Sequence, residues 1–101
     1  MQIVIGEITY NSKKITAAMT RRAMELNVEA LEAAAKAEEL KETKDAALAG
    51  ALLAAIESNI LAKARLICDV FDGAFGEDAL MDSLSNAEIN GMMNKIALGK
   101  D

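Results

Sequence analysis

No proline interrupts the 101 residues of this chain, and alanine is its commonest residue. Because proline is the strongest helix breaker and alanine the best helix former, the composition favours a few long helices over many short ones. Hydrophobic residues make up 52% of the chain but aromatic residues only 3%, so most apolar side chains are small or aliphatic. We therefore expect one mainly helical domain over residues 1–101, with a thin core.

Charge and residue usage exclude several classes of function. The net charge of −5 opposes binding to nucleic acid, which attracts basic proteins through counterion release. The chain has no histidine, so it lacks the usual general base and the commonest metal ligand, and we expect no enzyme activity, cofactor or metal site. The single cysteine, Cys68, lies between apolar neighbours and is expected to be a buried, reduced thiol in a cytoplasmic protein.

Neither a targeting signal nor a membrane span is expected. The N-terminal residues MQIVIGE lack the basic and apolar segments of a secretory signal. The longest apolar run, residues 46–56, is too short to cross a bilayer as a helix. We therefore expect a soluble protein without a membrane partner.

The first fifteen residues predict a β-hairpin. They are rich in β-branched side chains, and Gly6 and Glu7 interrupt them at a turn position. The expected strands cover about residues 2–5 and 8–15. An isolated hairpin is only marginally stable, so the helices of residues 16–101 must cover one of its faces.

The following segments predict helices of different character. Thr16 is a predicted N-cap for a first helix over about 17–26, which Asn27 either breaks or kinks. Residues 28–44 are rich in alanine, glutamate and lysine, which predicts a solvent-facing helix or a partly ordered arm. Gly73 and Gly76 predict a turn with Phe75 pointing inward, a short helical turn over 78–84, and a last helix capped by Ser85 or Asn86 that ends at Gly99.

The strongest helical pattern covers residues 45–71 and predicts a long central helix. Its apolar residues recur every three or four positions, which is typical of a helix with one buried face. This stripe is expected to be the main core element, with Glu57, Lys63 and Arg65 largely outside it. The stripe consists of Leu48, Leu52, Ile56, Ile60, Ala64, Ile67 and Phe71.

A short segment, DSLSNAEI at residues 82–89, resembles the phosphopantetheine attachment box of acyl carrier proteins. The resemblance implies that Ser83 carries the prosthetic group at a helix N-terminus. Only residues 84–101 follow Ser83, however, and carrier proteins need more chain there to enclose the acyl group. The alternative is that Ser83 and Ser85 are turn and capping residues.

Two longer segments together resemble the tail assembly chaperones of long-tailed bacteriophages. ITYNSKKITAAMTRRAMEL, residues 8–26, is similar to the strand and K-K-I-T-x-x-M-x-R-x-A-x-E-L helix start of that family. ICDVFDGAFGEDALMDSLSNAEI, residues 67–89, approximates its later apolar and acidic pattern, with Ser83 where the family usually has glycine. The resemblance implies a protein of the host bacterial cytoplasm that binds the tape measure protein, keeps it soluble and helps recruit tail tube subunits.

A thin core leaves long amphipathic helices partly uncovered, so we expect self-association or binding of a client helix. Methionine side chains suit such surfaces because they adapt to different apolar partners. Residues of the long and terminal helices are predicted to form or support the client surface, namely Ile60, Ile67, Phe71, Met92 and Met93. A phage adaptor or inhibitor that binds a host protein is the third hypothesis, beside the chaperone and the acyl carrier.

Overall fold

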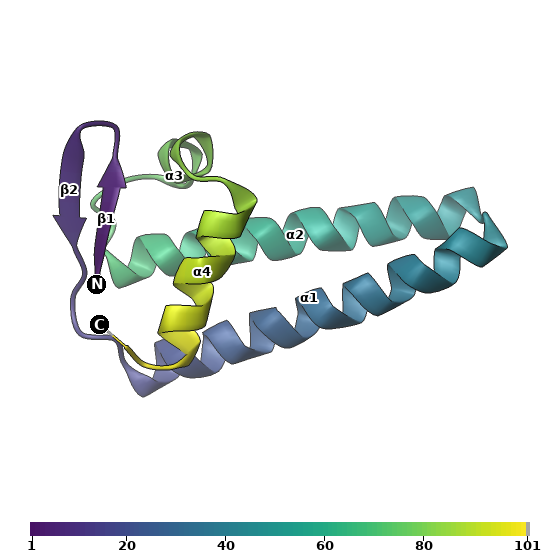
Figure 1. Ribbon diagram of the computed structural model, residues 1–101, viewed down its shortest axis with the longest axis horizontal. Coiled ribbons are helices and arrows are strands. Elements are labelled where there is room, and N and C mark those ends of the chain that lie inside the picture. The colour runs from purple at the N-terminus through teal and green to yellow at the C-terminus, as the bar shows by residue number, and fades with distance from the viewer. Residues whose placement is uncertain (101) are drawn as a thin grey trace.

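A computed structural model describes residues 1–100, apart from the side chain of Thr43, and shows the predicted class of fold. A short N-terminal hairpin leads into four helices, two of them long (Figure 1). In chain order the elements are β1 (Gln2–Ile5), β2 (Ile8–Asn11), α1 (Ala17–Thr43), α2 (Ala46–Val70), α3 (Glu77–Ser83) and α4 (Asn86–Ala97).

The first helix is much longer than predicted. Thr16 begins α1 as expected, because its hydroxyl accepts a hydrogen bond from the backbone N–H of Met19. Of the two alternatives at Asn27, the break is wrong, because α1 continues through it to residue 43. The alanine-rich stretch is thus a helix, as one of its two alternatives predicted. High intrinsic helix propensity explains this continuation, since a single asparagine costs less than the alanines around it contribute.

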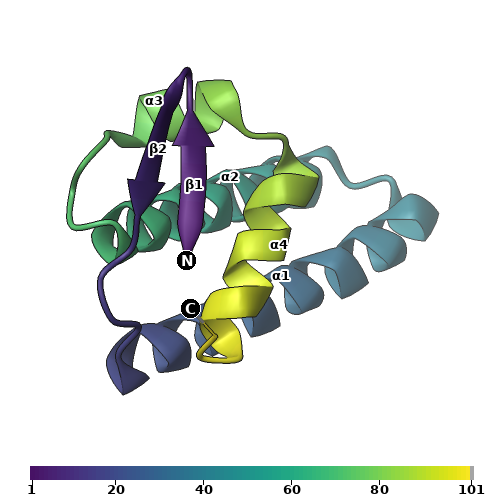
Figure 2. The same cartoon turned by 60° about the vertical axis from the view of Figure 1, so that its left-hand side comes forward.

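Two residues connect the long helices and reverse the direction of the chain. Lys44 has a left-handed backbone conformation with φ of 52°, and its N–H donates to the carbonyl of Leu40. Asp45 then caps α2, because its carboxylate accepts hydrogen bonds from the backbone N–H groups of Ala47 and Leu48. The short connection forces α1 and α2 to run antiparallel, side by side, as Figures 1 and 2 show.

The hairpin is antiparallel, with Ile3 opposite Tyr10. The sequence predicted that the second strand extends to about Ile15, but β2 ends at Asn11. The N–H of Ser12 still donates to the carbonyl of Met1 across the hairpin. The N–H of Lys13 instead donates to the carbonyl of Val70 at the end of α2, which ends the pairing. Ile15 is apolar for another reason, since its side chain enters the core between hairpin and helices.

The aromatic residues gather in one place. The rings of Tyr10 and Phe75 meet edge to face with centroids 5.1 Å apart, and Phe71 lies 5.5 Å from Phe75. They join the hairpin, the end of α2 and the loop after it, and Phe75 points inward as predicted.

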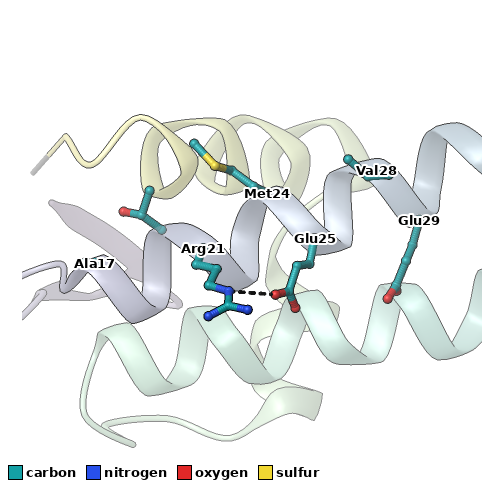
Figure 3. A pocket seen from close by; sticks show the side chains of 7 residues that line it. Ala17, Arg21, Met24, Glu25, Val28 and Glu29 are labelled. Carbon is teal, nitrogen blue, oxygen red and sulfur yellow. Dashed lines mark ion pairs between the residues drawn. The ribbon is translucent and has the colours of Figure 1, made fainter.

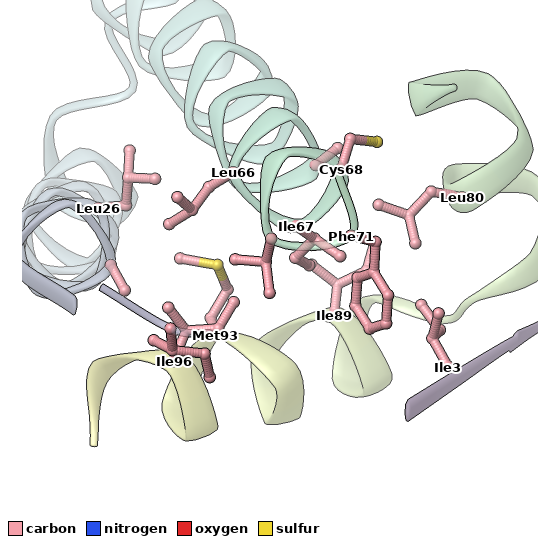
Figure 4. Close-up of a cluster of buried hydrophobic side chains, with 14 of the residues drawn as sticks. Ile3, Leu26, Leu66, Ile67, Cys68, Phe71, Leu80, Ile89, Met93 and Ile96 are labelled. Carbon is pink, nitrogen blue, oxygen red and sulfur yellow. The ribbon is translucent and has the colours of Figure 1, made fainter. Parts of the chain in front are cut away.

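All buried hydrophobic side chains lie at one end of the molecule, which we call the base: residues 1–27 and 59–100. There α4 crosses both long helices while the hairpin and α3 pack beside the end of α2 (Figures 1 and 2). Figure 4 shows part of this core. It consists of Ile3, Ile15, Ala23, Leu26, Ala64, Leu66, Ile67, Cys68, Val70, Phe71, Phe75, Leu80, Ile89, Met93 and Ile96.

The predicted core stripe of the central helix is only half correct. Ala64, Ile67 and Phe71 are buried, but Ile56 is half-buried and Leu48 is 55% exposed. The N-terminal half of α2 faces α1 residues that are mostly alanines, which are too short to cover large side chains. Lys63, in contrast, was expected outside the stripe and is buried, with its ammonium group donating to Asn90 of α4 at 3.2 Å.

The remainder of α1 and α2 extends beyond the base, and we call it the arm: residues 28–58. The radius of gyration of 14.9 Å exceeds the value of about 13 Å for a compact chain of this length. The longest dimension, 45 Å, lies along the two long helices. Both ends of the described chain lie at the base (Figure 1).

Candidate partner-binding surface

The five residues predicted to form or support a client surface lie in the base. Ile67, Phe71 and Met93 are buried in its core, as Figure 4 shows. Ile60 and Met92 are half-buried, and Met92 packs against the same core. While the base is folded, a partner cannot contact the three buried side chains. They can therefore support a client surface by packing beneath it, but they cannot form it.

The arm differs from the base because none of its described side chains is buried. Two helices alone form it, so each can cover only one face of the other. Large apolar side chains nevertheless occur on it, and among them Leu31 is 72% exposed and Leu53 57% exposed. Exposed apolar area of this kind marks sites of interaction with other proteins or with membranes.

Helix α2 provides most of this apolar surface. Its residues 46–56 form an apolar run without a charged side chain. By itself this run is shorter than a bilayer span, as expected from the sequence. The whole helix is nonetheless long and apolar enough, by length and composition, to cross a membrane, and only 11% of its most apolar window is buried. Core helices of soluble proteins also reach this hydropathy, but they do so with their side chains covered. In α2, by contrast, no element within residues 1–100 buries the side chains of the apolar N-terminal half.

A groove runs between α1 and α2 along the arm, and we call it the arm groove. Its floor is aliphatic and is formed by Leu40, Leu48, Ala51, Leu52 and Ala55. Another depression, on the opposite side of the helix pair, is lined in part by Asn86 and Asn90 of α4. The arm groove therefore opens on the side where α4 does not reach.

Charged residues of α1 form the rim of the arm groove. Glu29, Glu32 and Glu39 supply three carboxylates, and Lys36 supplies one ammonium group. An apolar floor beside a net acidic rim is complementary to an amphipathic helix that carries basic residues next to its apolar face. The arrangement is suited to binding a polypeptide.

Polar contacts fix the arm to the base at their boundary. The buried amide of Asn59 on α2 donates to the backbone carbonyl of Leu26 on α1 at 3.0 Å, and also approaches the carboxylate of Glu29 at 3.4 Å. The hydroxyl of Thr20 donates to the carbonyl of Ile96 at the end of α4. The bonds of Asn59 set the alignment of the two long helices, and thus which residues face each other across the arm groove, whereas the Thr20 bond joins α1 to α4 within the base.

The thiol of Cys68 lies in surroundings that make it unreactive. Cys68 is a free, buried thiol, as predicted, and burial raises its pKa, with smaller contributions from the carboxylates of Glu77 and Asp69. The thiol is therefore protonated and a poor nucleophile at neutral pH.

Ser83 is the last residue of α3, whereas the carrier protein resemblance places this serine at a helix N-terminus. Ser85 is the N-cap of α4, as one alternative predicted, and forms a reciprocal capping box with Glu88. The structure therefore favours the turn and capping interpretation of this segment.

The sequence matches the profile of the phage tail chaperone protein family over residues 4–99, nearly the whole chain. The chain belongs to this family. No curated protein and no solved structure matches it. The match confirms the resemblance stated from the sequence, and it extends through the middle of the chain, where the alanine-rich stretch had no counterpart in the quoted motifs.

Sequence reasoning assigned the α2 stripe residues in the arm of this tail chaperone, Leu48, Leu52 and Ile56, to the core and did not identify the groove. Leu48 and Leu52 have the spacing of core residues, so periodicity alone cannot separate them from Ile67. The signal that distinguishes them lies in the opposite helix, where residues 28–44 offer mainly alanine and charged side chains as a cover. The number of large apolar residues available to each stripe, and not its spacing, predicts which half is exposed.

Proposed function

We propose that this tail chaperone binds the tape measure protein through the arm groove, keeps it soluble in the host bacterial cytoplasm, and helps recruit tail tube subunits. Family membership supports the general role. The observation that carries the specific proposal is the arm: a helical hairpin with an uncharged, apolar second helix and no buried side chain among those described. A role by binding requires no covalent chemistry from the chain.

The charge of the arm supports a helical client with basic residues. Long helical proteins that await assembly expose apolar stripes, and their solubility depends on covering these stripes. The aliphatic floor of the arm groove provides such a cover, and the glutamates of its rim attract lysine or arginine beside the stripe.

Co-expression with the tape measure protein of the same phage tests the proposal. A variant carrying Leu48→Glu and Leu52→Glu places two charges in the floor of the arm groove, and we expect it to lose most of the soluble tape measure protein that the unchanged chain maintains. Leu98→Glu is the matched control, because Leu98 is 68% exposed and lies at the end of α4 in the base. Circular dichroism of both variants verifies that they are folded.

An equal yield of soluble tape measure protein with the groove variant and the control would refute the groove assignment. If the unchanged chain itself gave no soluble tape measure protein, the chaperone role toward this client would be wrong. A gene located between those for the tail tube and the tape measure protein supports the tail role over an adaptor for a host protein.

A further inference from the structure

Helix α1 has apolar residues on two opposite faces. One face, with Ala23 and Leu26 in the base and Leu40 in the arm, packs toward α2 or lines the groove beside it. Because successive residues of a helix are 100° apart, Met24, Val28 and Leu31 lie on the opposite face. We call Met24, Val28, Leu31 and Ala35 the outer stripe, and all four side chains are exposed.

The first half of the outer stripe, Met24 and Val28, lines a shallow depression on the surface of α1. Figure 3 shows Met24 and Val28 projecting from one side of the helix, and Arg21, Glu25 and Glu29 from the other. The carboxylate of Glu25 pairs with the guanidinium of Arg21 at 3.3 Å. The surface therefore combines an apolar line with an acidic flank, separate from the floor of the arm groove.

The spacing of the outer stripe is that of a coiled-coil seam. Met24, Val28, Leu31 and Ala35 follow one another at intervals of four, three and four residues, which are the d, a, d and a positions of a heptad repeat. A β-branched residue at a with leucine at d is the combination that favours two-stranded packing. The seam thus fits one further helix, over about 18 Å of its length.

The flanks of the seam differ in charge. Glu25, Glu32 and Glu39 occupy the e positions, whereas Asn27 and Ala34 occupy g positions and are neutral. Glu25 is already paired with arginine, but within residues 1–100 neither Glu32 nor Glu39 forms an ion pair. One flank of the seam therefore has a net negative charge, with Lys36 as the single cation between Glu32 and Glu39.

This asymmetry argues against a second copy of the chain as the occupant. In an antiparallel pair of outer stripes, the glutamates of one e flank would face those of the other and repel. In a parallel pair they would face the neutral g positions, Asn27 and Ala34, and form no ion pair. A different helix with an apolar seam and basic residues on the facing flank would pack against the outer stripe and form ion pairs with its glutamates.

We infer that the outer stripe of α1 binds one helix of a different polypeptide, with aliphatic residues at heptad spacing and lysine or arginine along the flank that faces Glu32 and Glu39. The inference goes beyond the proposed function, because this helix occupies a surface other than the arm groove. One molecule of the chaperone would then hold two helices, one on each side of the acidic residues of α1.

Two designed peptides of about three heptads test the inference. Both have valine at a and leucine at d; one has lysine at every e and g position, and the other has glutamate. We expect the full-length protein to bind the lysine peptide and not the glutamate peptide in a titration followed by NMR chemical shifts. Shifts are expected at Met24, Val28 and Leu31.

Variants of the protein identify the surface. Leu31→Glu is expected to weaken binding of the lysine peptide about tenfold or more, because it removes a seam leucine. Leu98→Glu in the base is the matched control and should leave binding unchanged. Leu48→Glu in the arm groove should leave the shifts at Met24, Val28 and Leu31 unchanged, because it does not alter the outer stripe. Replacement of Glu32 and Glu39 by lysine should reverse the preference in favour of the glutamate peptide.

Equal binding of both peptides, or undiminished binding by Leu31→Glu, would overturn the inference. Sedimentation of the protein alone gives a further test: a dimer that Leu31→Glu dissociates would show that a second copy occupies the stripe, contrary to the inference. The variant carrying Leu48→Glu and Leu52→Glu is expected to lose soluble tape measure protein but to keep the peptide-induced shifts at Met24, Val28 and Leu31. Failure of the proposed function and failure of this inference therefore give different results.

Discussion

The base and the arm are built from the same two helices, yet only the base has a core. Ile67 and Leu52 occupy equivalent places in the apolar stripe of α2, and the first is fully buried while the second is half-buried. Around Ile67 lie α4 and the hairpin, which contribute large side chains from several elements. Around Leu52 lies one alanine-rich helix. The comparison shows that spacing determines which face of a helix is apolar, and the neighbouring elements determine whether that face is covered.

The largest expected effect separates the two regions directly. Ile67→Ala should reduce the free energy of unfolding by about 2–5 kcal/mol, because it leaves a cavity in a packed core. Leu52→Ala should reduce it by about 1 kcal/mol, because much of the side chain is already in water. Urea denaturation followed by circular dichroism measures both, with Leu98→Ala as an exposed control expected to change stability by less than about 0.5 kcal/mol. Equal losses for the first two variants would contradict the distinction between base and arm.

Asn59 lies where the regions join, and its replacement tests how firmly the arm is fixed. Asn59→Ala removes the buried hydrogen bond to the carbonyl of Leu26 and should reduce the free energy of unfolding by about 1 kcal/mol. Hydrogen exchange should accelerate more in the arm than in the core helix around Ile67, because the arm has little other tertiary support. A uniform acceleration across both regions would indicate that the bond stabilises the whole fold and not the junction.

Gly50 tests whether the arm is limited by helix propensity. A Cβ added at this position meets no atom within 4 Å, so alanine fits without strain. Gly50→Ala should raise the free energy of unfolding by about 0.5–1 kcal/mol and slow hydrogen exchange in the N-terminal half of α2. Gly91→Ala in α4 is the matched control, since it also meets no atom within 4 Å but lies in the base. Slower exchange in the arm with Gly91→Ala would argue that the two regions are coupled.

The smallest expected effect concerns Lys63, the buried cation at the base. Burial lowers the pKa of Lys63 below its ordinary value of 10.5. Between the lowered pKa and 10.5 the folded protein binds fewer protons than the unfolded chain, so this group adds stability as pH rises through that interval. Lys63→Met should remove this alkaline gain, which is measured as the change in unfolding free energy between about pH 7 and about pH 10. A gain that persists unchanged in the variant would assign it to another group.

Much of the fold follows from local sequence signals. Thr16 and Ser85 cap their helices because their side-chain oxygens accept backbone hydrogen bonds, and such caps are local in sequence. Gly6 has the positive φ that the turn of the predicted hairpin requires. These features depend on a few neighbouring residues, so the sequence alone predicts them.

The features that the sequence did not predict depend on residues far apart in the chain. The end of β2 is set by a bond from Lys13 to Val70, and the burial of Lys63 is set by the path of α4 near Asn90. The exposure of Leu48 depends on how far α4 extends along α2. For the same reason, the predicted client residues were those with the best core spacing, and Ile67 and Met93 are now seen inside the base.

Both ends of the described chain lie beside the hairpin, and the turn at Lys44 and Asp45 lies at the other extreme of the 45 Å axis. A fluorescent protein or an affinity tag joined to either end would therefore lie far from the tip of the arm. Labels at the termini should leave binding in the arm groove undisturbed, while a probe placed in the Lys44–Asp45 turn would report on it directly.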